Sequence, residues 1–122
     1  MANVLVIEDN ATNMTLAVFL LESAGHSVSK AVNAEAGLTL AREQQPDLIL
    51  MDIQLPGMDG LQATALLKAD AVTRDIPVIA LTALAMKGDE ERIRAAGCNG
   101  YISKPISYRA FLATIASELA PA

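Results

Sequence analysis

The feature that most constrains the fold is the alternation of short apolar runs with longer segments of helical length. Runs typical of β-strands occur near residues 3–8, 27–32, 47–52, 76–81 and 100–103. The first, third and fourth runs are almost wholly apolar, as expected for strands that are buried on both faces. Segments of helical length occur near residues 12–24, 34–44, 59–69, 86–96 and 107–119. The pattern therefore predicts five consecutive βα units.

Five βα units are too few for a closed eight-unit barrel, and they favour an open parallel sheet with helices on both faces. We expect a flavodoxin-like, doubly wound (βα)5 fold of the α/β class, with strand order 2-1-3-4-5. A chain of 122 residues fits one domain. We therefore expect residues 1–122 to form a single domain without an output domain.

Reactive polar residues stand where four of the predicted strands end. Glu8 and Asp9 end the first run, Asp52 the third, Thr82 the fourth and Lys104 the fifth. In the expected strand order the first and third strands are neighbours, and ligands bind beyond the carboxyl ends at that point. The sequence therefore predicts a site at this edge that accepts a phosphoryl group with the help of a metal ion.

The acidic residues of this edge suit Mg²⁺, which prefers oxygen ligands and keeps several of its waters. We expect Asp9 and Asp52 to be direct ligands, Glu8 to act through a water, and the backbone carbonyl of Gln54 to fill a further position. The alternative is a solvated turn in which Asp9 or Asn10 caps the first helix.

Asp52 is the predicted nucleophile, because a carboxylate can attack phosphorus to form an acyl phosphate. The hydroxyl of Thr82 and the ammonium of Lys104 would stabilise the charge on the transferred group. A cis peptide between Lys104 and Pro105 would direct the ammonium back over the edge of the sheet. Taken singly, a threonine at a strand end and a surface lysine are commonplace, so the prediction depends on their combination.

The chain resembles the receiver domain of two-component response regulators. The resemblance is carried by the segments 4–9, 47–52 and 101–105, which read VLVIED, DLILMD and YISKP. It implies that Asp52 takes a phosphoryl group from a histidine kinase or a histidine phosphotransfer protein in the presence of Mg²⁺. It also implies a phosphoacceptor switch rather than an enzyme, with self-phosphorylation from small donors and autodephosphorylation.

Two stretches, residues 51–56 and 85–94, are similar to the stand-alone DivK type of receiver. Receivers of that type control cell division and polarity by binding kinases, which implies a downstream kinase or another effector protein as partner. Similar stretches occur in receivers attached to hybrid kinases, so an origin in a hybrid kinase is the alternative. The autodephosphorylation rate in the family is influenced by positions that correspond here to Gln54, Ala83 and Leu84.

The resemblance also implies a switch. Tyr101 matches the aromatic residue that changes rotamer in receivers when the hydroxyl residue, here Thr82, moves toward the phosphoryl group. The fourth predicted helix contains Gly88, which costs about 0.5–1 kcal/mol relative to alanine, and it has few apolar residues. We therefore expect phosphorylation to remodel the surface formed by this helix and the last strand and helix. A half-buried strand tyrosine is the alternative for Tyr101.

The first predicted helix carries apolar residues on more than one face. A core stripe is assigned to Leu16, Ala17, Leu20 and Ala24. Met14 and Val18 then point away from this core stripe, and Asn13 lies near the same edge of the helix. Receivers use this region to recognise kinases, so Asn13, Met14 and Val18 are predicted docking residues; ordinary surface hydrophobic residues are the alternative.

The charge and composition restrict the partners. A formal net charge of −5 argues against a direct nucleic-acid partner, and no apolar run approaches the ~20 residues of a membrane span. A single cysteine, Cys98, suits a reducing compartment. We expect a cytoplasmic monomer that acts on other proteins.

Two other functions fit a domain of this kind. The first is a binding module of the same fold that needs no phosphate, but such a module would be expected to lack one of the acids, Thr82 or Lys104. The second is a phosphatase with an aspartate nucleophile, or a nucleotide-binding enzyme. A phosphatase would usually have an acid two residues after the nucleophile, where this chain has Gln54, and no glycine-rich phosphate loop follows the first run.

Overall fold

The computed structural model describes residues 2–83 and 87–119. Strands and helices alternate along these residues, as the sequence predicts. The strands are β1 (Asn3–Ile7), β2 (Ser27–Ala31), β3 (Leu48–Asp52), β4 (Val78–Thr82) and β5 (Gly100–Ser103). The helices are α1 (Ala11–Ser23), α2 (Ala34–Gln44), α3 (Gly60–Ala69), α4 (Lys87–Ala95) and α5 (Tyr108–Leu119). Each element lies within two residues of its predicted bounds.

Some predictions fall on residues outside the described ranges. They are Leu84, which was assigned an influence on autodephosphorylation, and Ala85 and Met86, which open the second DivK-like stretch. Met86 was also the predicted start of the fourth helix.

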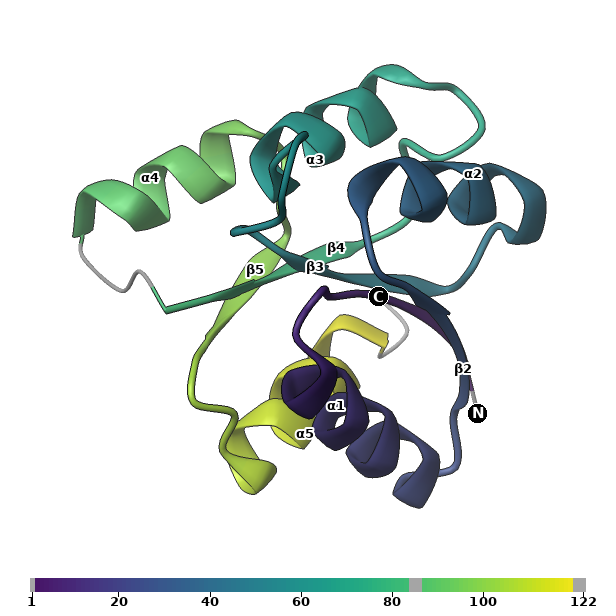
Figure 1. The fold of residues 1–122 in the computed structure, drawn as a ribbon, viewed down its shortest axis with the longest axis vertical. Helices are drawn as coiled ribbons and strands as arrows, with labels where there is room; N and C mark the ends of the chain where they lie inside the picture. Colours follow the sequence, from purple (N-terminus) through teal and green to yellow (C-terminus); the bar gives the residue numbers. More distant parts are fainter. Residues whose placement is uncertain (1, 84–86, 120–122) are drawn as a thin grey trace.

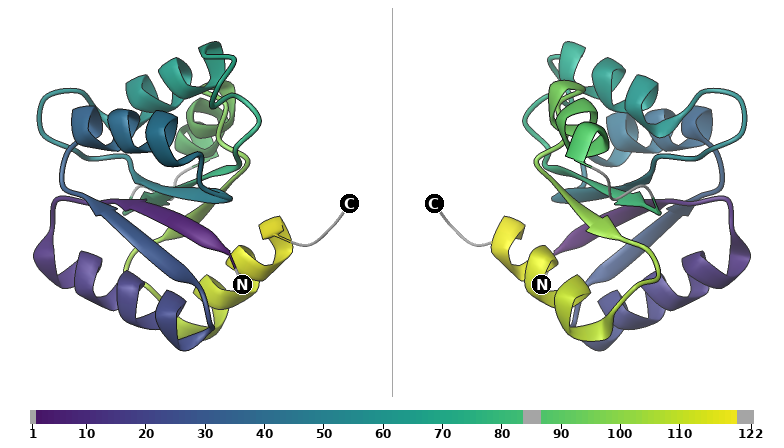
Figure 2. Two further views of the ribbon diagram at one scale, coloured as in Figure 1. Left: turned by 90° about the vertical axis from the view of Figure 1, so that its right-hand side faces the viewer. Right: turned by 90° about the vertical axis from the view of Figure 1, so that its left-hand side faces the viewer.

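The strands form one parallel sheet in the order β2-β1-β3-β4-β5. This is the predicted flavodoxin-like order, and the fold-class prediction is confirmed. Helices α2, α3 and α4 cover one face of the sheet, and α1 and α5 cover the other (Figure 1). The side views in Figure 2 show the same two layers of helices on either side of the twisted sheet. The sheet is therefore covered on both faces.

Coverage on both faces explains why the strands are apolar without alternation. Every residue of β3 and β4 is buried. Successive side chains point to opposite faces, so the strands supply two separate hydrophobic clusters. Ile49 and Met51 pack on the side of α2 to α4, and Leu48 and Leu50 pack on the side of α1 and α5. Among the described residues, the core side chains are aliphatic or contain sulfur, and Phe111 of α5 is the one buried aromatic residue.

Helices α1, α2 and α3 begin at polar caps that the local sequence supplies. Asn10 accepts a hydrogen bond from the Asn13 N–H, and Asn33 accepts one from the Ala36 N–H. Asp59 and Gln62 form a reciprocal capping box at the start of α3. Asn10 is the cap of α1, a choice that the sequence left open between Asp9 and Asn10. These caps determine where each helix starts beyond the carboxyl end of a strand.

Helix α1 corrects one sequence prediction. Its buried residues are Met14, Ala17, Leu20 and Leu21, whereas Leu16 and Ala24, which were assigned to the core, are exposed. Apolar residues occur around the whole helix, so periodicity alone did not determine which side faces the sheet. Contact with the sheet and with α5 selects the face that carries Met14.

Candidate functional site

The predicted site residues meet at the carboxyl edge of the sheet. β1 and β3 are paired up to Ile7 and Met51, so Glu8 and Asp52 lie one position beyond that pair on neighbouring strands. Oxygens of the Glu8, Asp9 and Asp52 carboxylates lie within 4.8 Å of one another. The side chains of Glu8 and Asp52 are buried, whereas Asp9 is exposed. The fold therefore brings together all three acids that the sequence singled out.

Lys104 joins two of these acids from the end of β5. Its Nζ lies 3.0 Å from Glu8 Oε1 and 3.1 Å from Asp52 Oδ2, and its side chain is 15% exposed. The Lys104 N–H donates to the carbonyl of Thr82 at 2.7 Å, which holds the residue against the end of β4. The peptide between Lys104 and Pro105 is cis, as the sequence analysis considered. The ammonium thus lies over the edge of the sheet and contacts the central acids.

Backbone N–H groups orient the same two carboxylates. The Asn10 N–H donates to Glu8 Oε2 at 3.1 Å, and the Gln54 N–H donates to Asp52 Oδ1 at 3.0 Å. In each carboxylate, therefore, one oxygen accepts a hydrogen bond from a backbone N–H two residues further along the chain, and the other forms an ion pair with Lys104. Two fixed contacts per carboxylate leave little freedom of rotation at the site.

The electrostatics of the site favour an additional cation. The site holds three carboxylates and one ammonium, which contacts two of them, so the fully ionised group carries two negative charges in excess. The pKa of Glu8 is raised from 4.5 to about 7. Burial is the largest cause, the hydrogen bond and the charge of Asp52 add to it, and the Asn10 N–H and Lys104 act in the opposite direction. Burial by itself would lower the pKa of Lys104, but its contacts with Glu8 and Asp52 outweigh burial, and the pKa is raised.

A divalent cation fits this donor set. The ligands that Mg²⁺ prefers are oxygens, and one or two carboxylates suffice. Glu8 Oε1 is buried, lies 3.0 Å from Lys104 Nζ as an ion pair, and has no partner with hydrogen-bond geometry among the described residues. A buried acceptor in this state is typical of a site that a further cation or an ordered water completes.

Thr82 and Tyr101 lie on the neighbouring strands β4 and β5. Thr82 is the last residue of β4, is fully buried and pairs in register with Ser103. Tyr101 is half-buried, and its hydroxyl donates to Glu90 Oε2 of α4 at 3.5 Å. Glu90 also lies 3.5 Å from Arg94 Nε in the same helix. The hydroxyl of Tyr101 thus connects β5 to α4, a contact that the sequence analysis did not foresee.

The predicted docking residues on α1 are only partly available. Met14 is 8% exposed and belongs to the core, so the prediction that it points outward is wrong. Asn13 and Val18 are half-buried. The exposed apolar residues of α1 are instead Leu16 and Phe19, with exposed fractions of 36% and 64%. Leu16 was assigned to the core stripe, and Phe19 was not singled out, although its spacing of three residues from Leu16 was visible in the sequence.

Comparison with known families and proteins gives a consistent result. The family model for the response regulator receiver domain matches residues 4–116. The polar-differentiation response regulator DivK of Brucella anthropi is 55% identical over 120 residues, which cover 98% of each chain. DivK of Brucella melitensis is 54% identical over the same length.

Solved structures agree with these relatives. A putative response regulator from Chloroflexus aurantiacus has a TM-score of 0.94 and 26% identity over 98% of both chains. The receiver domain of the sensor histidine kinase PA1611 from Pseudomonas aeruginosa has a TM-score of 0.90 and 35% identity over 97% of both chains. That structure has a magnesium ion coordinated in its active-site cleft.

A search of the described helices for a membrane span finds none of sufficient length and apolar character.

Proposed function

The chain belongs to the response regulator receiver domain family, and on that premise we propose that Asp52 is its phosphoacceptor. The observation that carries the proposal is the setting of the Asp52 carboxylate. One oxygen contacts the Lys104 ammonium, the other accepts from the Gln54 N–H, and two further acids stand beside it. The protein is a signalling switch, in which phosphorylation changes contacts with other proteins.

The proposed reaction transfers a phosphoryl group from a phosphohistidine. A carboxylate oxygen of Asp52 forms the new O–P bond while the N–P bond of the donor breaks, and the electron pair leaves with the imidazole. In the unphosphorylated protein the ammonium of Lys104 balances the charge of Glu8 and Asp52. After the transfer it binds an oxygen of the phosphoryl group. We assign the hydroxyl of Thr82, at the end of the adjacent strand, to a second oxygen of that group.

We assign Mg²⁺ to the acidic residues of the site. Asp9 and Asp52 would hold it directly, Glu8 through a water, and the backbone carbonyl of Gln54 would complete the protein ligands. The ion would neutralise charge on the phosphoryl oxygens during transfer. The magnesium ion in the related receiver of PA1611 supports this assignment.

Incubation with phosphoramidate and Mg²⁺ tests the proposed phosphoacceptor. We expect the mass of the wild-type chain to rise by one phosphoryl group and the mass of Asp52→Asn to stay unchanged. Asp75→Asn, which removes an exposed acid elsewhere, should be phosphorylated like the wild type. Uptake of a phosphoryl group by Asp52→Asn at the wild-type rate would refute the assignment. Decay of the mass shift after removal of the donor measures autodephosphorylation, which we also propose.

We propose that the donor, a histidine kinase or a histidine phosphotransfer protein, docks on α1 through Leu16 and Phe19. These residues are the exposed large apolar side chains of the helix that starts two residues after Asp9. Half-buried Asn13 and Val18 border this surface. The relatedness to DivK supports a kinase or another regulatory protein as the downstream partner.

Phe19→Ser is therefore expected to slow phosphotransfer from a phosphorylated histidine phosphotransfer domain about 10-fold, since truncating an exposed aromatic contact removes binding energy. Phosphorylation by phosphoramidate should stay at the wild-type rate, because Phe19 is remote from the reacting atoms in this proposal. Val72→Ser, which removes an apolar side chain that is 41% exposed beyond α3, is the control. Equal phosphotransfer rates for the two variants would contradict docking on α1. Both rates are measured by quenching the reactions at successive times and determining the phosphorylated fraction by mass spectrometry.

Tyr101 is the proposed link between phosphorylation and the α4–β5–α5 surface. We expect Tyr101→Ala to be phosphorylated at the wild-type rate. The ratio of partner affinities between its phosphorylated and unphosphorylated forms should be about 10-fold smaller than in the wild type. Tyr101→Phe removes only the hydroxyl contact to Glu90, so it separates the ring from that hydrogen bond. Affinity capture of partners with both forms of each variant measures the difference. Full phosphorylation-dependent binding by Tyr101→Ala would rule out the switch role.

The oligomeric state and the cellular location of the protein are also proposed. We propose that it acts as a monomer, as one receiver domain, in the cytoplasm. The lone thiol of Cys98, which is buried, is in keeping with a reducing compartment.

A further inference from the structure

Helix α3 begins against the backbone of Asp52, and the close approach depends on the glycine at position 60. A Cβ atom at Gly60 would lie 2.2 Å from the carbonyl oxygen of Asp52 and 2.8 Å from the Cα of Ile53. Both are backbone atoms, so no side-chain rotation could make room for it. A methyl group at this position would force α3 or the end of β3 to move.

Hydrogen bonds hold the first turn of α3 in this place. The Gly60 N–H donates to the carbonyl of Ile53 at 3.0 Å. On the other side, the hydroxyl of the fully buried Thr64 donates to the carbonyl of Gly60 at 2.8 Å. The start of α3 is therefore joined to the segment after Asp52 by contact and by hydrogen bonding.

That segment orients the reacting carboxylate. It leads from Asp52 through Ile53 to Gln54, and the Gln54 N–H donates to Asp52 Oδ1 at 3.0 Å. A shift of the backbone between Asp52 and Gln54 would change this hydrogen bond and turn the carboxylate. It would also move the carbonyl of Gln54. The position of the start of α3 thus determines the orientation of the Asp52 carboxylate and of the Gln54 carbonyl, which the proposed reaction uses.

We propose that Gly60 is a positioning residue for phosphoryl acceptance by Asp52. Lacking a side chain, it lets α3 lie directly against the Asp52 carbonyl, and this contact holds Asp52 and the Gln54 N–H in the reactive arrangement. Gly60 acts only through the backbone of Asp52 and touches no reacting atom. The inference rests on the proposed function of Asp52.

Other helical glycines lack this contact. A Cβ at Gly37 would meet the flexible side chain of Ile7, and one at Gly88 would meet nothing within 4 Å. Because Gly88 weakens the helix that the proposed switch remodels, the control is taken from α3 itself: Ala65→Ser also adds one heavy atom, at an exposed position of that helix.

The experiment follows phosphorylation of the full chain by phosphoramidate in saturating Mg²⁺. We expect Gly60→Ala to lower the maximal rate about 10- to 100-fold, because a displacement of roughly 1 Å in a reacting group costs that much. The donor concentration at half-maximal rate should stay close to the wild-type value. In an NMR spectrum the amide proton of Gln54 should shift upfield as its hydrogen bond to Asp52 weakens. Ala65→Ser should match the wild type in both measurements.

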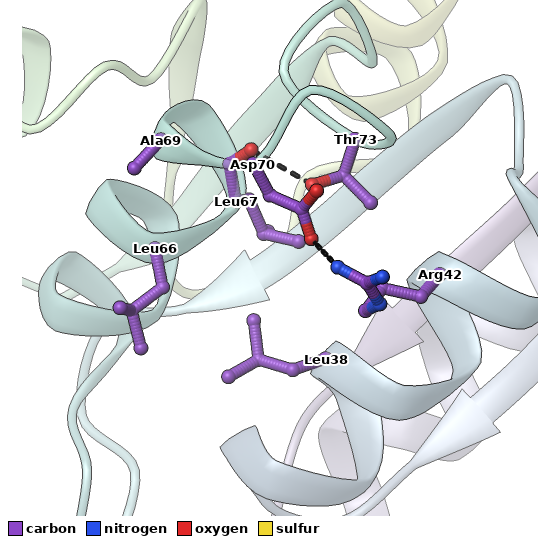
Figure 3. A pocket seen from close by; sticks show the side chains of 7 residues that line it. All are labelled: Leu38, Arg42, Leu66, Leu67, Ala69, Asp70 and Thr73. Carbon is purple, nitrogen blue, oxygen red and sulfur yellow. Dashed lines mark hydrogen bonds and ion pairs between the residues drawn. The ribbon is translucent and has the colours of Figure 1, made fainter.

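A second pair of variants decides the question if Gly60→Ala does not fold. Thr64→Val removes the hydroxyl that holds the Gly60 carbonyl and is expected to lower the maximal rate about 5-fold. Thr64→Ser keeps the hydroxyl and should restore the rate. Thr73→Val is the control: its buried hydroxyl donates to the carbonyl of Leu67 at 2.8 Å, at the opposite end of α3 (Figure 3). It should keep the wild-type rate although it loses an equivalent hydrogen bond.

The outcomes separate the inference from the function on which it rests. A folded Gly60→Ala with the wild-type maximal rate and an unshifted Gln54 amide would overturn the positioning role alone. With Gly60→Ala unfolded, equal rates for Thr64→Val and Thr73→Val would overturn it as well. A wild type that takes up no phosphoryl group would instead overturn the proposed function, and the positioning role with it.

Discussion

Replacing Lys104 with methionine is expected to lower the free energy of unfolding by about 3 kcal/mol at neutral pH without Mg²⁺. The ammonium lies within 3.1 Å of carboxylate oxygens of Glu8 and Asp52, whose side chains are at most 3% exposed. Removing one partner of a buried ion pair leaves the other charge without compensation, and here it leaves two. Urea unfolding of the wild type and the variant measures the difference.

The size of this loss should depend on pH. In the variant Glu8 escapes the repulsion by taking up a proton, which becomes easier as the pH falls. The pKa of Glu8 is about 7 in the wild type, so near pH 5 the carboxyl is protonated in both proteins. The loss is therefore expected to be smaller near pH 5 than above pH 7, where only the variant has to take up the proton. Lys30→Met removes an exposed lysine and should change the stability by less than about 0.5 kcal/mol at either pH. A small or pH-independent loss in Lys104→Met would show that the ammonium does not balance the buried acids.

The second large effect concerns Glu8, whose pKa rises from 4.5 to about 7 on folding because the carboxyl is buried beside Asp52. Between these two values the folded chain binds more protons than the unfolded chain. Stability therefore falls as the pH rises through this window and stays level above it. The difference of about 2.5 pH units corresponds to about 3 kcal/mol.

Comparison with Glu8→Gln isolates this contribution, because the amide does not titrate and the other groups cancel in the difference. We expect the stability of the wild type relative to Glu8→Gln to decrease by about 3 kcal/mol from the lower to the upper end of the window in chelated buffer. Saturating Mg²⁺ should reduce the decrease, since the ion binds the ionised site and displaces the proton. A relative stability that is flat with pH, or that does not respond to Mg²⁺, would contradict this account.

Most of the fold could be predicted because its signals are local. An apolar run without alternation indicates a strand buried on both faces, and glycine, proline and asparagine mark where elements end. The same local signals placed Asp9, Asp52, Thr82 and Lys104 at strand ends. Parallel strands have their carboxyl ends at one edge, so the proximity of the three acids followed from the topology.

The orientation of α1 could not be predicted in this way. Its apolar residues surround the helix, so the sequence is compatible with more than one buried side. Packing against the sheet and α5 buries Ala17 and Leu20 as predicted, but it also buries Met14 and leaves Leu16 exposed, against the prediction. The outcome depends on surfaces that come from distant parts of the chain.

By itself, then, the sequence determined the order of strands and helices, the class of fold and the chemical groups along one edge of the sheet. These follow from hydrogen bonding and periodicity over a few neighbouring residues. Only the tertiary structure decided that Lys104 contacts both Glu8 and Asp52, that burial raises the pKa of Glu8 to about 7, and that Gly60 lies against the Asp52 carbonyl. Each of these depends on distances between elements far apart in the chain, which packing in three dimensions establishes.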